Sequence, residues 1–310
     1  MQTPPEITPR DWLMVATLGL VWGATFMAIE IALEGITPFW LAAGRIGFAA
    51  LLTLSVWGLL RGRLWRDPEQ PRPWPNLLVI GTLSSALPFM LLSWGQQSVT
   101  SGFAGVSMAG VALMVLPLAH FFVPGERLTL RKGAGFAIGF VGVVILIGGS
   151  AFTSTGAEME TLGRLACVGA AGCYAISSVM TRRLPPMDPI GLAAVMLVVG
   201  TAVVIPLAWA VEGPPPLPDT RTVLVLAILG LVPTAGANLL RVLVIRSAGP
   251  VFMSLTNYQV PVWSVVFGAT ILGEPLPPTL LIALALILAG VALSQYRALR
   301  RLFGLDRPAR

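Results

Sequence analysis

The chain has 310 residues, of which 55% are hydrophobic and only 11% charged, and its formal net charge is +6. Soluble domains carry about 25% charged residues, so this composition excludes an ordinary soluble protein. The basic residues are scattered over short segments and form no single patch, which argues against a nucleic-acid-binding protein.

Apolar runs of about 20 residues recur along the chain, and each is long enough to cross a hydrocarbon core about 30 Å thick. The first run is too long for the apolar part of a signal peptide and has no A-x-A cleavage pattern after it, so we expect it to remain in the protein. The sequence predicts spans at residues 12–33, 38–60, 76–96, 101–122, 132–149, 163–181, 189–211, 220–241, 249–271 and 278–297. Cys167 and Cys173 lie on different faces of one run, so no disulfide between them is expected.

The basic residues predict the orientation of these spans. With the N-terminus in the cytoplasm, most of the 20 Lys and Arg residues lie in cytoplasmic segments, and Arg164 and Arg221 fall outside. Arg45 and Arg241 lie within spans. This distribution follows the positive-inside rule and places both termini in the cytoplasm.

The two halves of the chain resemble each other. Gly125 and Glu126 match Gly273 and Glu274, each pair standing ahead of the last span of its half, and PFWLAA from Pro38 matches PIGLAA from Pro189. Five spans per half is an odd number, so the second half must be inverted in the membrane relative to the first. The expected fold is an all-α integral membrane protein whose ten transmembrane helices form two inverted five-helix repeats, at residues 1–150 and 151–310.

These motifs resemble those of the drug/metabolite transporter superfamily, and of its EamA-type members in particular. The similarity rests on Trp22-Gly23, on Pro38 with Arg45 entering the second span, and on the two Gly-Glu pairs with the Gly-rich spans after them. Within the superfamily the chain is most similar to the aromatic amino acid exporters. The resemblance implies a multi-pass protein of the bacterial inner (plasma) membrane, and export as the direction of transport.

Aromatic and polar residues near the middle of the spans are the candidate substrate contacts. Tryptophan and tyrosine normally lie at the membrane interfaces, so a mid-span N–H or O–H needs a partner or a watery cavity. Each of these aromatics either lines such a cavity or packs between helices, and each hydroxyl can instead satisfy a carbonyl of its own helix. The residues are Trp22, Thr25, Ser85, Phe89, Ser107, Met108, Tyr174, Ser177, Asn238, Asn257, Tyr258 and Trp263.

Prolines mark the same region. Pro88 and Pro233 occupy the third and eighth spans, which are repeat partners, and Pro117 and Pro261 occupy the fourth and ninth. Paired helix breaks in two repeats point to a transport site, although proline also shapes transmembrane bundles without any such role.

Charged and small residues within the spans have structural interpretations. Glu30 and Arg45 flank a short loop at similar depth, and we expect a structural ion pair between them. Glu126 and Glu274 precede helices and suit their positive ends. The pairs Gly19 with Gly23 and Gly135 with Gly139 predict close helix packing.

The sequence favours transport over other functions. An enzyme would need a catalytic constellation, and a pump a phosphate-binding loop, and neither motif occurs. A phosphorylated substrate would need several basic residues in the core, where the sequence has almost none. A cationic drug would need a mid-span carboxylate, but Glu30 lies too near the outer end of its span. Amino acids, aromatic and other largely neutral ones, are therefore the expected substrates, with sugars, nucleosides or drug-like compounds as the alternative. We expect no metal, cofactor, nucleic acid or obligate protein partner; the expected partners are the lipid bilayer and the small-molecule substrate.

Overall fold

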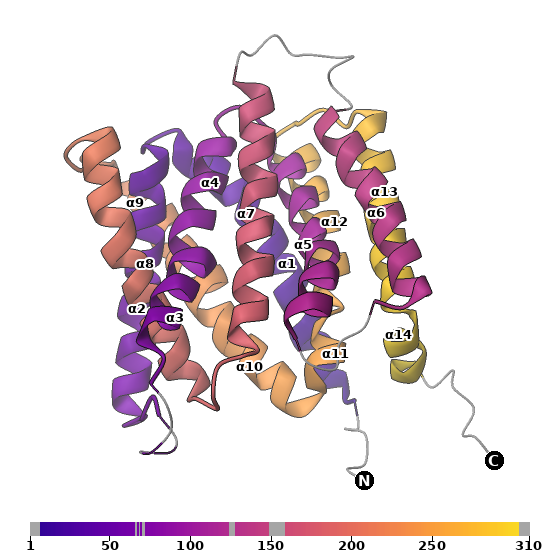
Figure 1. Cartoon of the computed structure of the whole chain (residues 1–310). Helices are drawn as coiled ribbons and strands as arrows, with labels where there is room; N and C mark the ends of the chain where they lie inside the picture. Colours follow the sequence, from indigo (N-terminus) through magenta and orange to yellow (C-terminus); the bar gives the residue numbers. More distant parts are fainter. Residues whose placement is uncertain are drawn as a thin grey trace.

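The structure is a computed structural model that describes residues 7–65, 67, 69, 72–123, 128–148 and 159–303. Within these residues the regular structure is helical, apart from one isolated bridge between Trp65 and Met187. The helices stand side by side as a bundle, and α1 begins and α14 ends at its lower edge (Figure 1).

The first half forms six α-helices and one π-helical segment. They are α1 (Pro9–Leu33), α2 (Pro38–Leu59), α3 (Trp74–Gly81), η1 (Thr82–Ala86), α4 (Leu87–Gly95), α5 (Ser101–Phe122) and α6 (Leu130–Gly148). The π-helical η1 joins α3 and α4 into one continuous rod, Trp74–Gly95.

The second half follows a similar plan. Its elements are α7 (Glu160–Thr181), α8 (Pro189–Glu212), α9 (Thr220–Leu229), η2 (Gly230–Gly236), α10 (Ala237–Ser247), α11 (Gly249–Met253), α12 (Thr256–Ile271), α13 (Pro278–Ser294) and α14 (Tyr296–Leu302). Here η2 is the π-helical segment, and it joins α9 and α10 into the rod Thr220–Ser247. The expected ninth span is split after Met253, and the expected eighth extends to Ser247.

Seven helical rods of the described chain are long and apolar enough to cross a membrane, and Pro278–Ser294 is a shorter apolar helix. The count of ten spans stays a prediction. Local chemistry explains where the rods begin. Thr8 and Asp11 form a capping box on α1, and proline stands in the first turn of α2, α8 and α13. Hydrogen bonds donated by Thr222 hold the pKa of Asp219, the N-cap of α9, below its usual value.

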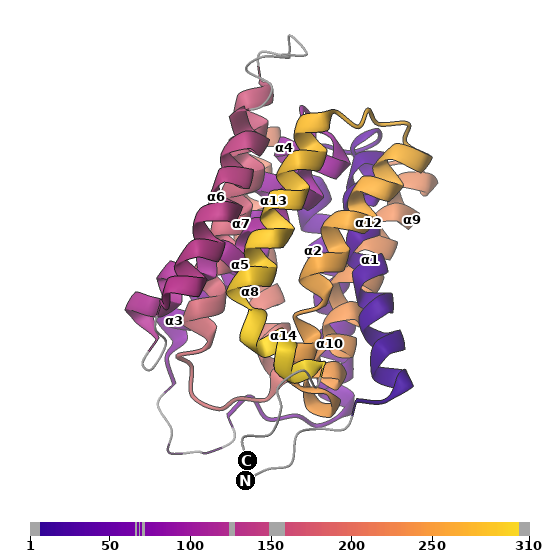
Figure 2. The same ribbon diagram turned by 90° about the vertical axis from the view of Figure 1, so that its right-hand side faces the viewer.

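Packing between the halves is reciprocal. Helix α6 packs along α13 and α2 along α8, while α1 packs on α12 as α7 packs on α5. Figures 1 and 2 both show α6 and α13 side by side. Because α1 and α7 open the two halves, and α5 and α12 occupy matching later positions, exchanging the halves reproduces the same set of contacts.

Glycines allow the closest of these approaches. A Cβ at Gly23 would lie 2.4 Å from Cβ of Trp263, and one at Gly19 would lie 2.6 Å from Cβ of Gln259. Between α6 and α13, a Cβ at Gly135 would lie 2.6 Å from the carbonyl oxygen of Gly290. The predicted role of the small residues in helix packing is confirmed. Cys167 and Cys173 are both free and buried, so they are packing residues.

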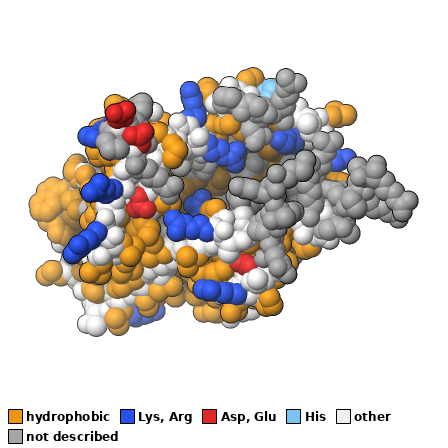
Figure 3. Space-filling view, turned by 90° about the horizontal axis from the view of Figure 1, so that it is seen from below, with side chains coloured by type: hydrophobic (Ala, Val, Ile, Leu, Met, Phe, Trp, Pro, Cys, Tyr) orange, Lys and Arg blue, Asp and Glu red, His pale blue; other side chains and the backbone are white. Residues whose placement is uncertain are grey.

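The outer surface is apolar, as a lipid environment requires. Large hydrophobic side chains such as Leu13, Leu51 and Leu130 are exposed on it. Seen from below, Lys and Arg side chains lie across the face of the bundle, with hydrophobic side chains around them (Figure 3).

Candidate functional site

Two π-helical segments interrupt repeat-related rods near their middle. Pro88 is the second residue after η1, in the first turn of α4, and Pro233 lies inside η2. Single π-helical turns within helices frequently occur at functional sites, because they leave backbone groups outside the regular hydrogen-bond ladder. The indole Nε1 of Trp22 donates a hydrogen bond of 2.9 Å to the carbonyl oxygen of Pro233. This bond ties α1 to η2.

The other two prolines do not break their helices, contrary to the expectation from sequence. Pro117 and Pro261 lie inside α5 and α12, which remain α-helical around them. A proline removes one backbone hydrogen bond, and close packing can hold the helix through that loss. The packing is close here, because a Cβ at Gly105 of α5 would lie 1.9 Å from Oγ of Ser264 in α12.

Arg45 occupies the centre of the site. Its side chain projects from α2 and is only 6% exposed. Its Nε donates a 2.8 Å hydrogen bond to Oγ1 of Thr234 in η2, and its guanidinium lies 3.9 Å from the ring centroid of Phe89 in α4. The hydroxyl of Thr234 in turn donates to the carbonyl of Leu229. Arg45 therefore joins the regions of both π-helical segments.

The expected ion pair between Glu30 and Arg45 is wrong. The guanidinium of Arg45 contacts Thr234 and Phe89, while the carboxylate of Glu30 interacts with Gln96, the C-cap of α4. The sequence predicts a similar membrane depth for Glu30 and Arg45, but the rotation of α1 and α2 about their axes turns the two side chains toward different neighbours. The contacts of Arg45 with Thr234 and Phe89 were not predicted, because the spacing in the sequence suggested Glu30 as its partner.

Tyr174 completes this centre from α7. It packs against two hydrophobic clusters, one of which contains Phe89, and lies near enough to Arg45 to interact with it electrostatically. Trp22, Arg45, Phe89, Tyr174 and Thr234 thus come from five different elements of both halves. We call these five residues the central cluster.

Most of the predicted polar residues bind carbonyls of their own helix. Ser85 also donates to the carbonyl of Met196 and so ties η1 to α8. The own-helix bonds are made by Thr25, Ser85, Ser107, Ser177 and Asn238. Apart from the bond between Ser85 and Met196, the own-helix interpretation accounts for every hydrogen bond that these side chains make with described residues.

The predicted residues of α12 make no hydrogen bond with the central cluster, although Tyr258 and Tyr174 pack against the same hydrophobic cluster. Asn257 is exposed in the first turn, and Trp263 stacks on Phe267 with ring centroids 5.6 Å apart. The buried hydroxyl of Tyr258 has no hydrogen-bond partner among the described residues. Met108 of α5 packs, like Tyr258, against the cluster that contains Phe103.

Glu274 caps a helix, but not its own. Its carboxylate accepts hydrogen bonds from the backbone N–H of Ser101 and Gly102, 2.7 and 3.0 Å long, at the start of α5. The expectation that Glu274 caps the helix that it precedes is therefore wrong, because its carboxylate interacts with the positive end of α5. Glu126, its repeat partner, lies outside the described residues.

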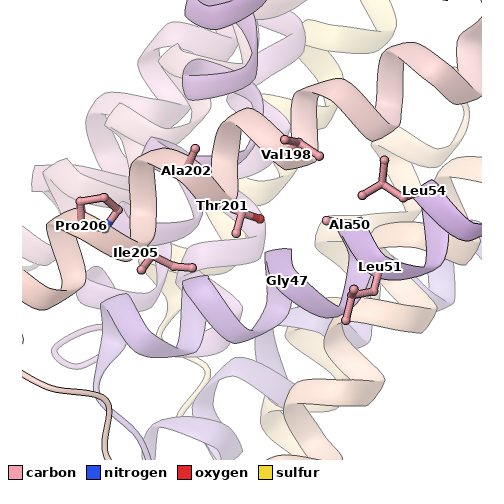
Figure 4. Close-up of a pocket in the computed structure, with 9 residues that line it drawn as sticks. All are labelled: Gly47, Ala50, Leu51, Leu54, Val198, Thr201, Ala202, Ile205 and Pro206. Atoms are coloured by element: carbon pink, nitrogen blue, oxygen red, sulfur yellow. The ribbon is translucent and has the colours of Figure 1, made fainter.

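A groove of about 620 Å³ lies elsewhere, between α2 and α8 (Figure 4). Its lining is apolar except for Thr201, whose hydroxyl is bound to the carbonyl of Leu197. A polar metabolite would lose its hydration there without new hydrogen bonds. The remaining lining residues are Gly47, Ala50, Leu51, Leu54, Val198, Ala202, Ile205 and Pro206.

Apolar rods, repeat-related helix interruptions and a buried arginine between the halves define a membrane transporter, since broken helices that meet at mid-depth are typical of transport sites. The EamA-like transporter family matches residues 11–148 and again residues 161–296. The chain belongs to this family. The double match agrees with two repeats in one chain.

Three curated relatives carry names of transporters. The "Uncharacterized inner membrane transporter YedA" of Escherichia coli is 29% identical over 280 residues, which cover 89% of this chain and 87% of the relative. The "Probable terminal-alkyne amino-acid exporter" of Streptantibioticus cattleyicolor is 29% identical over 308 residues, covering 98% and 99%. The "S-adenosylmethionine/S-adenosylhomocysteine transporter" of Chlamydia muridarum is 23% identical, covering 95% and 94%.

A solved crystal structure has the same fold. Its TM-score is 0.65 at 23% sequence identity, and the match covers 94% of this chain and 99% of the other. The family and the relatives are membrane transporters, so the chain is a transporter and not an enzyme.

Proposed function

We propose that the chain exports amino acids, aromatic and other largely neutral ones, and related small metabolites by alternating access, with the substrate carboxylate bound by Arg45. The observation that carries this proposal is a guanidinium buried in the core with no carboxylate partner among the described residues. A charge inside the membrane is costly unless it is paired, so such a residue indicates a functional site.

The geometry of Arg45 suits a carboxylate ligand. Thr234 and the ring of Phe89 hold Nε and one face of the guanidinium, while the two Nη groups donate no hydrogen bond to described residues. The planar guanidinium presents its N–H donors as a fork that matches the two oxygens of a carboxylate. The fixed orientation reduces the entropy lost on binding.

Aromatic side chains around Arg45 suit the rest of an amino acid. Phe89 and Tyr174 provide apolar walls, and Trp22 lies beside η2 at the same level. Sugars and nucleosides instead need many hydroxyl or amide contacts, and most candidate polar side chains are bound to their own helices. The alternative substrates, including drug-like compounds, are therefore less well supported. A relative named as a probable amino-acid exporter agrees with this choice.

The transport mechanism that we propose uses two inverted five-helix repeats, at residues 1–150 and 151–310, in the bacterial inner membrane. Both termini are cytoplasmic, and the substrate lies between the halves at mid-depth. The double family match and the reciprocal packing of α1 on α12 and α7 on α5 support this arrangement. Rocking of one half against the other would then expose the site to each side in turn.

Counterflow in proteoliposomes tests the substrate class. The purified chain should exchange labelled phenylalanine, and a panel of other amino acids, nucleosides and quaternary amines defines its range. Phenethylamine, which is phenylalanine without the carboxylate, is the matched control, and we expect no exchange of it because Arg45 would have no anion to bind. Exchange of phenethylamine but not of phenylalanine would contradict the proposal.

Two substitutions of Trp22 distinguish its aromatic contact with the substrate from its hydrogen bond to the Pro233 carbonyl. Trp22→Ala removes an aromatic wall, so uptake of large apolar amino acids should fall more than uptake of alanine or threonine. Trp22→Phe keeps a ring but leaves the Pro233 carbonyl without the indole, which should cost about 1 kcal/mol of stability. Uptake at matched protein levels and thermal unfolding in detergent measure the two effects. Equal losses for all substrates in Trp22→Ala would remove Trp22 from the site.

The topology is tested by labelling. Single cysteines placed at residues 68 and 157, in a background without Cys167 and Cys173, should react with a membrane-impermeant reagent from opposite sides. Position 68 should be reached from the cytoplasm and position 157 from outside. The three expected spans 76–96, 101–122 and 132–149 lie between them, and an odd number of spans places two positions on opposite sides of the membrane. Labelling of both from one side would contradict the ten-span inverted arrangement.

A further inference from the structure

Three of the buried polar atoms that lack a hydrogen-bond partner come from one neighbourhood, at the end of α1 remote from its start. They are Oε2 of Glu30, Oε1 of Gln96 and Oγ of Ser101. Gln96 and Ser101 are 2% and 0% exposed. A buried polar atom without a partner costs about 1–3 kcal/mol, so three such oxygens together require an explanation.

Contacts with neighbouring residues connect these three atoms. Gln96 interacts with the Glu30 carboxylate, and Glu274 lies near enough to Glu30 for mutual repulsion. Ser101 donates its backbone N–H to Glu274. A Cβ at Gly268 would lie within 2.8 Å of Ser101 Oγ and 2.2 Å of Glu274 Oε2, so these two side-chain oxygens also line one small space.

All the partnerless atoms in this neighbourhood are oxygens; those of the Glu30 carboxylate and the Gln96 amide can only accept a hydrogen bond, whereas the Ser101 hydroxyl can also donate one. The amide of Gln96 cannot be reversed, because its Nε2 donates a 2.8 Å hydrogen bond to the Phe26 carbonyl, which can only accept. Its Oε1 therefore has no donor among the described residues. Two carboxylates near enough to repel each other, beside an amide oxygen without a donor, favour the binding of one positive charge.

We propose that Glu30 binds the proton that drives transport, with Gln96 and Glu274 as the residues that set its site. One proton adds to Oε2 of Glu30 and forms an O–H bond, and no other covalent bond changes. That O–H can donate to Oε1 of Gln96, so a single proton supplies two of the three oxygens, those of Glu30 and Gln96, and removes the repulsion from Glu274. The proton leaves when the carboxylate is exposed to the other side of the membrane.

The other titratable groups of α1 and of the elements packed on it do not change the assignment of the proton to Glu30. Glu34 follows Glu30 by one turn and pairs with Arg221 of α9 at 2.9 Å, while Arg45 of α2 is bound to Thr234. Ser247 at the end of α10 bonds to Asp11 at the start of α1, so α10 packs along the half of α1 remote from Glu30. The elements packed on α1 contribute in addition Tyr258 of α12, His120 of α5, and Arg241 and Arg246 of α10.

The position of Glu30 provides a route for coupling, and here the inference rests on the proposed function. Trp22, which is bonded to η2 beside Thr234 and Arg45, lies eight residues before Glu30 in the same helix, about 12 Å along its axis. A shift of α1 on proton binding would therefore be transmitted to the Trp22 contact in the central cluster. In the proposed orientation Glu30 lies toward the outside, from which a proton would enter as a substrate leaves.

Infrared difference spectroscopy tests the proton directly and needs no substrate. The full-length chain in lipid should show the C=O stretch of a protonated carboxyl group that titrates with pH. The band should vanish in Glu30→Gln and persist in Glu34→Gln, a matched control because Glu34 is an exposed carboxylate at the C-cap of the same helix. Should Glu30→Gln fail to fold, Gln96→Met must shift the band, because the O–H loses its acceptor. A missing band in the wild type, or an unshifted one in Gln96→Met, would overturn the proposal.

Proteoliposomes test the coupling. Phenylalanine uptake is measured with and without an imposed pH gradient, and the ratio of the two rates is compared between variants. We expect a ratio well above one for the wild type and for Glu34→Gln, and near one for Glu30→Gln. Equal ratios in all three proteins, or stimulation by a sodium gradient without a carboxyl band, would refute proton coupling at Glu30. Failure of all phenylalanine transport would instead count against the proposed function, and the infrared result would still decide the proton site.

Discussion

Replacing Arg45 by Gln should abolish most transport of amino acids. The substrate carboxylate would lose its charged, forked donor, and removing one partner of a buried charge pair costs about 2–5 kcal/mol. This corresponds to about 30-fold or more in transport rate at low substrate concentration. Arg45→Lys should also be impaired, because an ammonium group keeps the charge but can neither form the bidentate contact nor lie flat over Phe89.

The control for Arg45 is Arg221→Gln, which removes an exposed arginine whose partner is Glu34 at 2.9 Å. An exposed ion pair contributes little, so this variant should transport at the wild-type rate. Thermal unfolding with and without phenylalanine separates binding from folding. Arg45→Gln should unfold at a temperature that phenylalanine no longer raises. Wild-type uptake by folded Arg45→Gln would show that the arginine has no part in substrate binding.

Replacing Gly290 by Leu should have the largest effect on folding. A Cβ there would lie 2.5 Å from the carbonyl oxygen of Gly135 and 2.7 Å from Cα of Gly139, so α6 and α13 would have to separate. Overpacking costs about 1–3 kcal/mol where side chains can yield, and more is expected here because the opposing atoms belong to the backbone. Yield of folded protein and thermal stability in detergent measure the loss.

Gly172→Ala is the matched control for Gly290→Leu. No atom lies within 4 Å of a Cβ at Gly172 of α7, and alanine is a better helix former than glycine. Stability should therefore stay the same or rise slightly. Since α6 and α13 lie away from the central cluster, any folded Gly290→Leu protein should keep the order of preference among amino acids. Wild-type stability of Gly290→Leu would show that the two helices are not in this contact.

Several features followed from the sequence because they depend on local chemistry. Long apolar runs require helices in a membrane, and proline or a polar cap begins α1, α2 and α8 where the pattern predicts. Small residues at Gly23 and Gly135 predicted close contacts between helices, which the structure contains. The repeat-related prolines at 88 and 233 also marked the two rods that the structure interrupts.

The sequence by itself therefore determined the class of protein, most helix boundaries and the existence of two related halves. Only the tertiary structure decided the partners of the charged residues. Arg45 meets Thr234, 189 positions away, instead of Glu30, because the π-helical turns and the rotation of each helix select the face that a side chain presents. The bond between Trp22 and the Pro233 carbonyl has the same origin, since it joins helices 211 positions apart. Periodicity gives the depth of a residue in the membrane, but contacts between distant helices decide which residues form the site.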